Sequence, residues 1–313
     1  MEIYQLRYFA AVAETGNFTK AASRSFISQP SLSQQILNLE EELGQTLFHR
    51  LGRKVSLTPA GELLLERAHR IIAEADDAVR ELKEDPAQGH RVSVGVIPTV
   101  AHFFLPAILA YCRANEVKLH LQTREDFRPT VVQAVLDGDL ELGVVPLPVN
   151  EPRIETSMLF SEPLLLAIAA DHPLATAPNV TLEDLRDQDF IMLGTGSSTA
   201  TQVQRLLGDH DFEPRVLHRV AQLSTAKALT ALGVGISVLP RSARTANDPA
   251  GLVYRKFSGK VPMREIALIR HYRHHHTKGA KLFTDAAHAV VGPMQTAQAQ
   301  TTPPFRTLGS TQS

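Results

Sequence analysis

The sequence predicts an α/β protein that begins with a small helical domain, continues through one long helix and ends in two lobes. Three observations lead to this prediction. Two short helices separated by a tight turn precede a β-hairpin within the first sixty residues, an apolar heptad pattern follows, and strand and helix patterns alternate from residue 91 onwards. Such alternation is typical of α/β folds with parallel strands.

Composition places the chain among globular proteins of two or three domains. Its 313 residues are 43% hydrophobic with a formal net charge of −1, which excludes a disordered chain, a collagen or a coiled-coil rod. The single Cys112 cannot form an internal disulfide, and the N-terminus has no long apolar stretch. We therefore expect neither export nor membrane insertion, and a cytoplasmic location.

The first two helices are expected near residues 3–14 and 19–25. Apolar residues recur at helical spacing in the first, and Gly16 follows it. Ala21 and Ala22 in the second are small enough to let another helix approach closely.

A third helix is expected to begin at Ser28, which can cap it. Pro30 stands in the first turn, where no intrahelical N–H bond is lost. Apolar residues at spacings of 4, 3 and 4 between residues 32 and 43 form the inward stripe, and Gly44 ends the helix. The polar residues Gln29, Ser33 and Gln34 are left on the other faces.

Two helices joined by a tight turn, with amides and hydroxyls at the start of the second, fit a helix-turn-helix. These groups can bond base edges in a major groove, and the helix N-terminus favours a phosphate. The alternative is a surface hairpin of helices without a DNA role. Val55 and Leu57 alternate after the basic turn Arg50–Lys54, which predicts a wing whose cations can reach phosphates or a minor groove.

A long helix is expected from Pro59 to about Glu84, roughly 38 Å at 1.5 Å per residue. Its apolar residues repeat as a heptad seam, and its opposite face is acidic. We expect a second copy of the chain to cover the seam, because DNA half-sites are read by two-fold pairs. The alternative is that the seam packs on the chain's own C-terminal domain. The seam residues are Leu64, Ala68, Ile71, Ala75, Ala78 and Leu82.

The rest of the chain is expected to form two α/β lobes after a break at 85–89. Residues 294–313 lack periodicity and are rich in Gln, Thr and Pro, which predicts a disordered tail. Strands are expected near 91–96, 118–123, 140–145, 164–169, 190–193, 216–220, 236–239 and 266–269, with helices from 98 and near 131–136, 201–207, 224–232 and 281–291.

The chain resembles the LysR-type transcriptional regulators over nearly its whole length. The segment NFTKAASRSFISQPSLSQQILNLEEELGQTLFHRLGRKVSLTPAG carries the match to that family's helix-turn-helix, wing and start of the linker helix. The resemblance implies a winged helix-turn-helix at 1–58, a dimerising linker helix and hinge at 59–89, and a regulatory domain at 90–293, before the tail at 294–313. The regulatory domain is expected to resemble periplasmic binding proteins, with lobe I at about 90–163 and 267–293, lobe II at about 164–266, and an effector cleft between them.

Carried over residue by residue, the resemblance assigns DNA contacts to the third helix and the wing. The expected DNA-binding residues are Ser28, Gln29, Pro30, Ser31, Ser33, Gln34, Arg50, Arg53 and Lys54.

Within the family, the C-terminal half is most similar to the peroxide-sensing OxyR branch, through residues 94–109, 160–175, 190–207 and 231–240. The positions that hold the reacting and resolving cysteines in those sensors correspond to Ser198 and Leu207. Neither side chain can be oxidised to a disulfide, and Cys112 lies on an apolar helix stripe, so it is expected to be inert core. We therefore expect no peroxide sensing by thiol oxidation.

In similar regulators, Thr99 and the loop Gly194–Thr199 face one another across the lobes. Two helix N-termini with hydroxyls aimed at one gap would suit a small anion or polar ligand. The alternative is an ordinary strand-to-helix turn with capping hydroxyls. The expected effector-binding residues are Thr99, Gly196, Ser197, Ser198, Thr199 and Thr201.

Four histidines at 271 and 274–276 could bind Zn or Ni, but consecutive side chains diverge and no cysteine or carboxylate completes the set, so a solvated basic loop is expected. No catalytic motif is present. We therefore expect no metal, no cofactor and no enzymatic activity.

The expected function is a DNA-binding transcriptional regulator that responds to a small polar or anionic effector. The expected partners are double-stranded DNA, the effector, and further copies of the chain in a dimer through the linker helix and in a homotetramer, with RNA polymerase as a candidate. The alternatives are a solute-binding or enzymatic α/β domain with an N-terminal oligomerisation module, and a regulator whose cleft is only structural.

Overall fold

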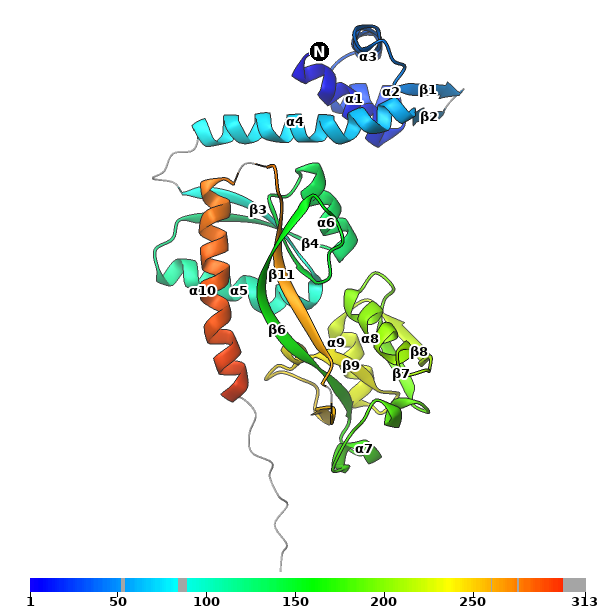
Figure 1. Cartoon of the computed structure of the whole chain (residues 1–313), viewed down its shortest axis with the longest axis vertical. Helices are drawn as coiled ribbons and strands as arrows, with labels where there is room; N and C mark the ends of the chain where they lie inside the picture. The colour runs from blue at the N-terminus through cyan, green and yellow to red at the C-terminus, as the bar shows by residue number, and fades with distance from the viewer. Residues whose placement is uncertain (52–53, 84–88, 260, 275, 301–313) are drawn as a thin grey trace, which may run out of the picture.

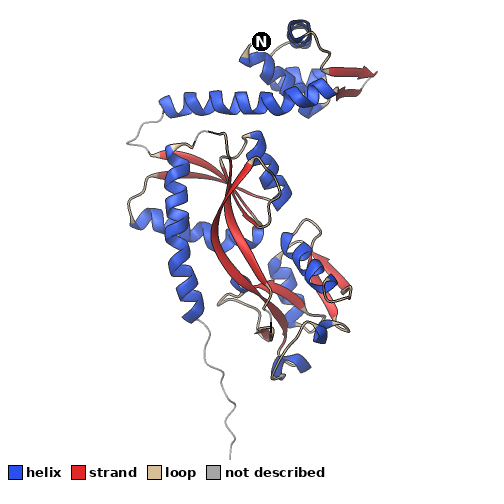
Figure 2. Cartoon of the chain, in the orientation of Figure 1, coloured by secondary structure: helices blue, strands red, loops and turns tan. Residues whose placement is uncertain are grey.

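The computed structural model describes residues 1–51, 54–83, 89–259, 261–274 and 276–300 (Figure 1). A helical domain with a β-hairpin lies at one end, a long helix runs alongside it, and a two-lobed α/β body makes up the rest (Figure 2). This arrangement confirms the predicted fold class. In the part of the chain that is described, no helix is both long and apolar enough to cross a membrane.

The N-terminal domain packs three helices and a hairpin around one apolar core. Phe9, Leu32 and Ile36 are fully buried in it, which explains the helical spacing of the apolar residues. Glycines at 16 and 44 adopt the left-handed conformation that ends the first and third helices. The elements are α1 Ile3–Thr15, α2 Phe18–Arg24, α3 Gln29–Leu43, β1 Phe48–Leu51 and β2 Lys54–Leu57.

The long helix α4 Pro59–Lys83 divides its seam between two environments. Leu64 and Ala68 pack into the core of the N-terminal domain of their own chain, and Ala68 is fully buried. Ile71 is 39% exposed and Leu82 88% exposed. The prediction that a second copy covers the whole seam is therefore wrong for its first half, because heptad spacing identifies an apolar stripe and not its partner.

Lobe I is built on parallel strands flanked by helices. β3 pairs in parallel with β4 and with β5, as the sequence predicts. The helix α6 approaches this sheet closely because Gly95 and Gly143 carry no side chain: a Cβ on either would lie under 3 Å from Val131. The elements are β3 His90–Val96, α5 Pro98–Ala114, β4 Leu119–Glu125, α6 Arg128–Asp137, β5 Leu142–Pro146 and α10 Lys278–Gln300.

Lobe II has a separate apolar core. Its strands β7 and β8 are parallel, and β9 and β10 pair with the strand that enters from lobe I. The sequence analysis missed β10 and the short helix α7. The elements are α7 Pro173–Thr176, η1 Glu183–Leu185, β7 Asp189–Leu193, α8 Ser198–Gly208, β8 Arg215–Val220, α9 Leu223–Ala231, β9 Ser237–Pro240, η2 Arg241–Ala243 and β10 Leu252–Arg255.

Two long antiparallel strands, β6 Ile154–Ala169 and β11 Met263–His271, join the lobes. We call this pair the crossing ribbon. It corrects two predictions: β6 starts ten residues before the expected strand at 164, and the sheets are mixed and not parallel throughout. The first part of β6 has exposed side chains, so its apolar pattern begins only where both faces become buried.

The first residues of the segment expected to be a disordered tail are helical in the structure. The helix α10 continues to Gln300, seven residues into the segment expected to be disordered. Met, Ala and Gln are good helix formers, so these residues can be helical although they lack apolar periodicity. Residues 301–313 lie outside the described part.

Gly279 lets the start of α10 touch β3, since a Cβ there would lie 1.9 Å from the carbonyl oxygen of Arg91. We expect Gly279→Ala to lower the unfolding free energy by about 1–3 kcal/mol through this overpacking. Gly208→Ala, which meets open space on α8, should be neutral or slightly stabilising. Urea denaturation compares the two, and equal effects would contradict the close approach.

Candidate DNA interface and interlobe cleft

The helix-turn-helix presents the polar start of α3 to solvent. Ser28 caps α3 by accepting a hydrogen bond from the Ser31 amide at 3.2 Å, and Pro30 lies in the first turn. Since Leu32 and Ile36 face the core, the remaining side chains of this turn point outward. The α3 residues predicted to bind DNA are therefore arranged on one accessible helix end.

These predicted DNA-binding residues differ little in accessibility. The exposed ones are Ser28, Gln29, Pro30, Ser31 and Gln34. Ser33 is half-buried, and its hydroxyl accepts a bond from the side-chain amide of Gln29 at 3.3 Å. None of them is sealed inside the domain.

The wing is the β1–β2 hairpin, in which Arg50 pairs with Val55 and Leu51 with Lys54. Arg50 and Lys54 thus lie on its strands, and Arg53 lies outside the described residues. The base of the hairpin is fixed by a buried carboxylate that the sequence analysis missed. Glu40 on α3 accepts bonds from the amides of Leu47 at 2.7 Å and Phe48 at 3.3 Å, which holds the hairpin against α3.

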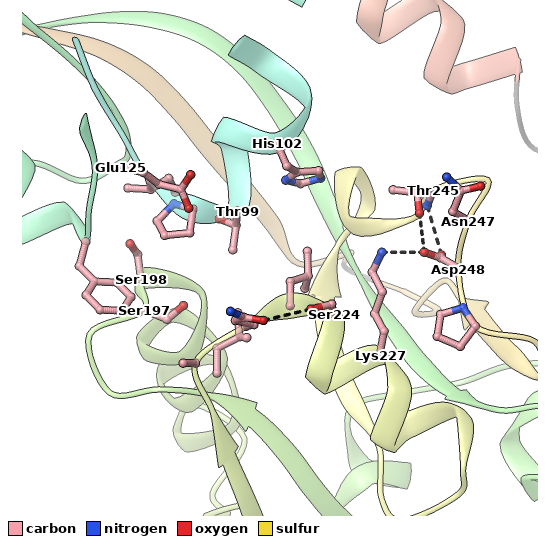
Figure 3. Close-up of a pocket in the computed structure, with 18 residues that line it drawn as sticks. Thr99, His102, Glu125, Ser197, Ser198, Ser224, Lys227, Thr245, Asn247 and Asp248 are labelled. Carbon is pink, nitrogen blue, oxygen red and sulfur yellow. Dashed lines mark hydrogen bonds and ion pairs between the residues drawn. The ribbon is translucent and has the colours of Figure 1, made fainter. Parts of the chain in front are cut away.

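A cavity of about 580 Å³ lies between the lobes (Figure 3). The N-termini of three helices border it: α5 through Thr99, α8 through Ser197 and Ser198, and α9 through Ser224. A helix N-terminus carries a partial positive charge and unpaired N–H groups. The cavity therefore receives three partial positive charges from both lobes.

The cavity is lined by both apolar and polar side chains. Ile97, Phe127 and Leu193 are among the apolar ones. A Cβ on Gly196 of lobe II would lie 2.7 Å from the ring of Phe127 of lobe I, so the two lobes approach each other closely here. Glu125, Ser197 and Ser198 lie on one side of the cavity, and Lys227, Thr245, Asn247 and Asp248 lie on the opposite side.

Lys227 and Asp248 form a buried ion pair with Nζ and Oδ1 2.6 Å apart. Thr245 also donates to Asp248, through its amide and its hydroxyl. Burial works to raise the pKa of Asp248, but the bonds from Lys227 and Thr245 hold it below its ordinary value. The pair therefore adds little net charge to the cavity.

A second buried pair lies on the crossing ribbon beside the cavity. Arg264 on β11 and Glu162 on β6 are opposite each other in register, and both side chains are 1% exposed. Nε of Arg264 donates to Glu162 at 2.8 Å, and the amide and hydroxyl of Ser242 complete the carboxylate's partners at 2.6 and 3.0 Å. Burial lowers the pKa of Arg264, and Glu162 opposes that effect.

Arg264 also connects the two lobes. Its Nη1 donates to the hydroxyl of Thr99 at 2.9 Å and to that of Thr199 at 3.3 Å. Thr99 belongs to the first turn of α5 in lobe I, and Thr199 to the first turn of α8 in lobe II. One guanidinium thus ties both helix N-termini to the ribbon.

The structure separates the predicted effector residues into two groups. Thr99, Ser197 and Ser198 line the cavity. The hydroxyl of Thr199 is buried against Arg264, Gly196 lies against Phe127, and Thr201 is exposed with its hydroxyl bonded to the Ser197 carbonyl. Four residues of this region were not predicted from the sequence: His102, Lys227, Asp248 and Arg264. For Lys227 a signal was present, because it is an isolated lysine in the apolar helix 223–231.

The histidine cluster is not the solvated loop that the sequence predicts. His271 is buried at the end of β11 and stacks on His274 with ring centroids 4.0 Å apart. Burial, with the neighbouring His274 adding, lowers the pKa of His271 to about 4. Among described residues no group of three or more potential ligands could hold a metal, and His275 lies outside them.

Cys112 is buried in the lobe I core, and burial raises the pKa of its thiol. Ser198 is half-buried at the cavity and Leu207 is fully buried in lobe II. The single cysteine of the chain leaves no partner for an internal disulfide.

Comparison with known proteins gives two family matches that together span most of the chain. Residues 3–62 match the bacterial regulatory helix-turn-helix protein, lysR family, and residues 86–292 match the LysR substrate binding domain. The chain is 32% identical over 249 residues to the transcriptional regulator BenM of Acinetobacter baylyi, covering 78% of this chain and 82% of that protein.

Two solved structures share the whole architecture. A full-length OxyR variant from Pseudomonas aeruginosa is 28% identical with a TM-score of 0.70, covering 92% of this chain and 98% of that one. Full-length CbnR in complex with its target DNA is 27% identical with a TM-score of 0.62, covering 93% and 100%.

The crossing ribbon offers a matched test of its buried pair. Glu162→Gln leaves Arg264 buried without an opposite charge, and we expect it to lower the unfolding free energy by about 3–5 kcal/mol. Glu155→Gln removes the exposed pair with Arg270 on the same two strands, which should cost at most about 1 kcal/mol. Urea denaturation at pH 7 measures both, and similar losses would show that burial of the first pair has no special effect.

Proposed function

Because the chain belongs to the LysR family of transcriptional regulators, we propose that its DNA binding responds to a small anionic effector held in the interlobe cavity. The observation that carries this proposal is the convergence of three helix N-termini on one cavity of about 580 Å³. Lys227 and Asp248 neutralise each other, and Glu125, which also lines the cavity, is exposed to solvent that screens its charge. The helix N-termini therefore supply positive potential for a ligand.

Such an effector has an anionic group and an apolar body. The hydroxyls of Ser197, Ser198 and Ser224 and the first-turn amides of these helices suit a carboxylate or phosphate. The apolar lining residues Ile97, Phe127 and Leu193 suit a hydrocarbon part. Binding does not involve thiol oxidation, because the one thiol is buried in the lobe I core.

We assign DNA reading to the start of α3 and phosphate contacts to the wing. Ser28, Gln29, Pro30, Ser31, Ser33 and Gln34 form the reading set, supported by their accessibility and by the outward N-terminus of α3. The cations Arg50, Arg53 and Lys54 of the wing supply the electrostatic, sequence-independent part of binding.

The active form is proposed to be a homodimer through α4 that associates into a tetramer. The second half of the seam supports this assignment, because Ile71 and Leu82 are exposed within the described chain. We place the protein in the cytoplasm, where it binds DNA, and we assign it no enzymatic activity. RNA polymerase is a candidate partner.

Gln29 and Arg53 are expected to have different roles in DNA binding. Gln29→Ala should cost about 1–3 kcal/mol on the best operator and relax the preference at one base pair. Arg53→Ala should weaken binding to all sequences alike and reduce the salt slope by about 1. Fluorescence anisotropy on DNA obtained by genomic selection measures both, and Gln45→Ala, an exposed glutamine beyond α3, should bind as the parent does. Uniform losses for Gln29→Ala and Arg53→Ala alike would contradict the assignment.

An anionic ligand should stabilise the regulatory domain against heat. Against a panel of small carboxylates and phosphates, with hydrogen peroxide as comparison, at least one anion at about 100 times its Kd should add about 2.7 kcal/mol, or roughly 5–10 °C in Tm. Ser198→Ala should reduce that shift, and Ser56→Ala on the wing should not. If no anion raises Tm, the cavity is structural and the effector proposal is wrong.

A further inference from the structure

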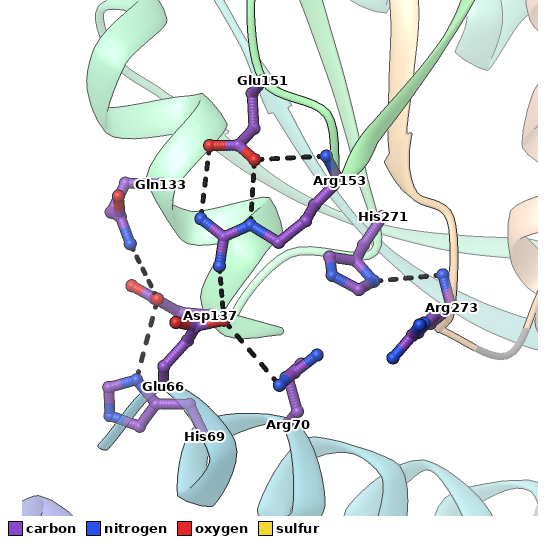
Figure 4. Close-up of polar contacts among 9 residues, drawn as sticks. All are labelled: Glu66, His69, Arg70, Gln133, Asp137, Glu151, Arg153, His271 and Arg273. Carbon is purple, nitrogen blue, oxygen red and sulfur yellow. Dashed lines mark hydrogen bonds and ion pairs between the residues drawn. The ribbon is translucent and has the colours of Figure 1, made fainter. Parts of the chain in front are cut away.

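The long helix α4 touches lobe I at a polar contact that no part of the proposed function requires. We call it the linker junction: Glu66, His69 and Ala73 on α4, with Asp137, Gly138 and Arg153 on lobe I (Figure 4). The helix α4 is already part of the DNA-binding unit, since its first half lies in that core and Arg7 on α1 bonds Asp76 at 3.0 Å. The linker junction therefore sets how the whole unit lies on lobe I.

Arg153 is held in its orientation toward α4 by a second carboxylate, that of Glu151. Glu151 receives bonds from its Nε at 2.9 Å and its Nη2 at 3.2 Å, which fixes the plane of the guanidinium. The remaining Nη1 donates to Glu66 at 2.7 Å. A side chain held in this way loses little conformational entropy when it binds α4.

His69 lies where three elements meet. Its Nδ1 is 3.7 Å from Asp137 of lobe I, and its Nε2 is 3.7 Å from Glu14 of α1. The nearby carboxylate of Asp137, against the effect of burial, raises the pKa of His69. The side-chain amide of Gln133 donates to the same Oδ1 of Asp137 at 2.8 Å, which orients that carboxylate.

The packing at the linker junction leaves no space for a larger residue. Gly138 has a φ of +85°, and a Cβ on it would lie 2.5 Å from the Cβ of Ala73. Close apolar contact and paired charges together indicate a built interface and not a chance approach.

The crossing ribbon connects this junction with the cavity. Arg153 immediately precedes β6, and Glu162 in the same strand carries the buried pair beside the cleft. On β11, Arg264 lies at the cleft end, while His271 pairs with Ile154 at the junction end. A change at the cleft that bends or slides these strands also moves Arg153.

We propose that the linker junction is a latch that holds the DNA-binding unit on lobe I in one orientation, and that the crossing ribbon couples this latch to the interlobe cavity. Arg153 and Glu66 act as positioning residues. Because the pair is partly exposed, its loss changes the ratio of latched to unlatched molecules by roughly five-fold and does not unfold the chain.

The test is a distance measurement in the full-length protein. Spin labels on Ser23→Cys in α2 and Asp285→Cys in α10, both exposed positions, report the separation of the DNA-binding unit and lobe I. The native Cys112 is buried, and dilution with unlabelled chain limits the signal to pairs within one chain. Pulsed dipolar spectroscopy should give one main distance for the parent, and a roughly five-fold smaller share relative to other distances in Glu66→Arg and in Arg153→Glu.

The controls separate a latch from general damage. The two single changes remove the same contact, so the double variant Glu66→Gln with Arg153→Gln should shift the distribution no further than either single Gln variant does. Arg67→Glu, an exposed reversal on the same helix, should leave the distribution unchanged. If a reversal lowers Tm, the single Gln variants replace it. Parent-like distributions in both single variants, or additive shifts in the double variant, would overturn the latch.

The coupling has its own pair of variants. Glu162→Gln at the cleft end of the ribbon, measured at a temperature where circular dichroism shows it fully folded, should shift the distance distribution at the other end, and Glu155→Gln on the same strand should not. An unchanged distribution in Glu162→Gln would overturn the coupling. Since none of these measurements uses DNA or a ligand, they stand or fall independently of the effector proposal.

Discussion

The buried pair of Arg264 and Glu162 is the interaction on which the organisation of the regulatory domain depends. Two charges that are each 1% exposed are stable only when their remaining hydrogen-bonding groups have partners. Here those partners are Ser242, Thr99 and Thr199, which come from η2, α5 and α8. Satisfying one guanidinium and one carboxylate thus fixes the relative positions of both lobes around the cavity.

The same ribbon gives the molecule its continuity. A two-lobed domain joined by flexible loops would let each lobe move independently. Here β6 and β11 are hydrogen-bonded to each other, β6 contributes to the cores of both lobes, and β11 contributes to the core of lobe I. Motion between the lobes must therefore bend or twist a β-ribbon. Such motion changes the position of both ends of the strands, one at the cleft and the other near α4.

Local features could be predicted from the sequence and long-range ones could not. The start and end of α3 follow from Ser28, Pro30 and Gly44, because capping acts within one turn. That Thr99, Ser197 and Ser198 stand at helix starts could be predicted locally, whereas their placement across one cavity came from the family resemblance. Glu162 and Arg264 are 102 residues apart, and nothing local marks them as partners. The seam of α4 shows the same limit: the spacing of Leu64 and Ala68 identifies an apolar stripe, but its partner is α1 of their own chain.

The contact of Phe127 with Gly196 has a kinetic consequence. An aromatic ring of lobe I that lines the cavity lies close to the backbone of lobe II. A molecule that passes between these two groups requires the ring to rotate away or the lobes to separate. The dwell time of whatever occupies the cavity would then be governed there by the opening rate of the protein, in addition to the strength of the bonds it makes inside.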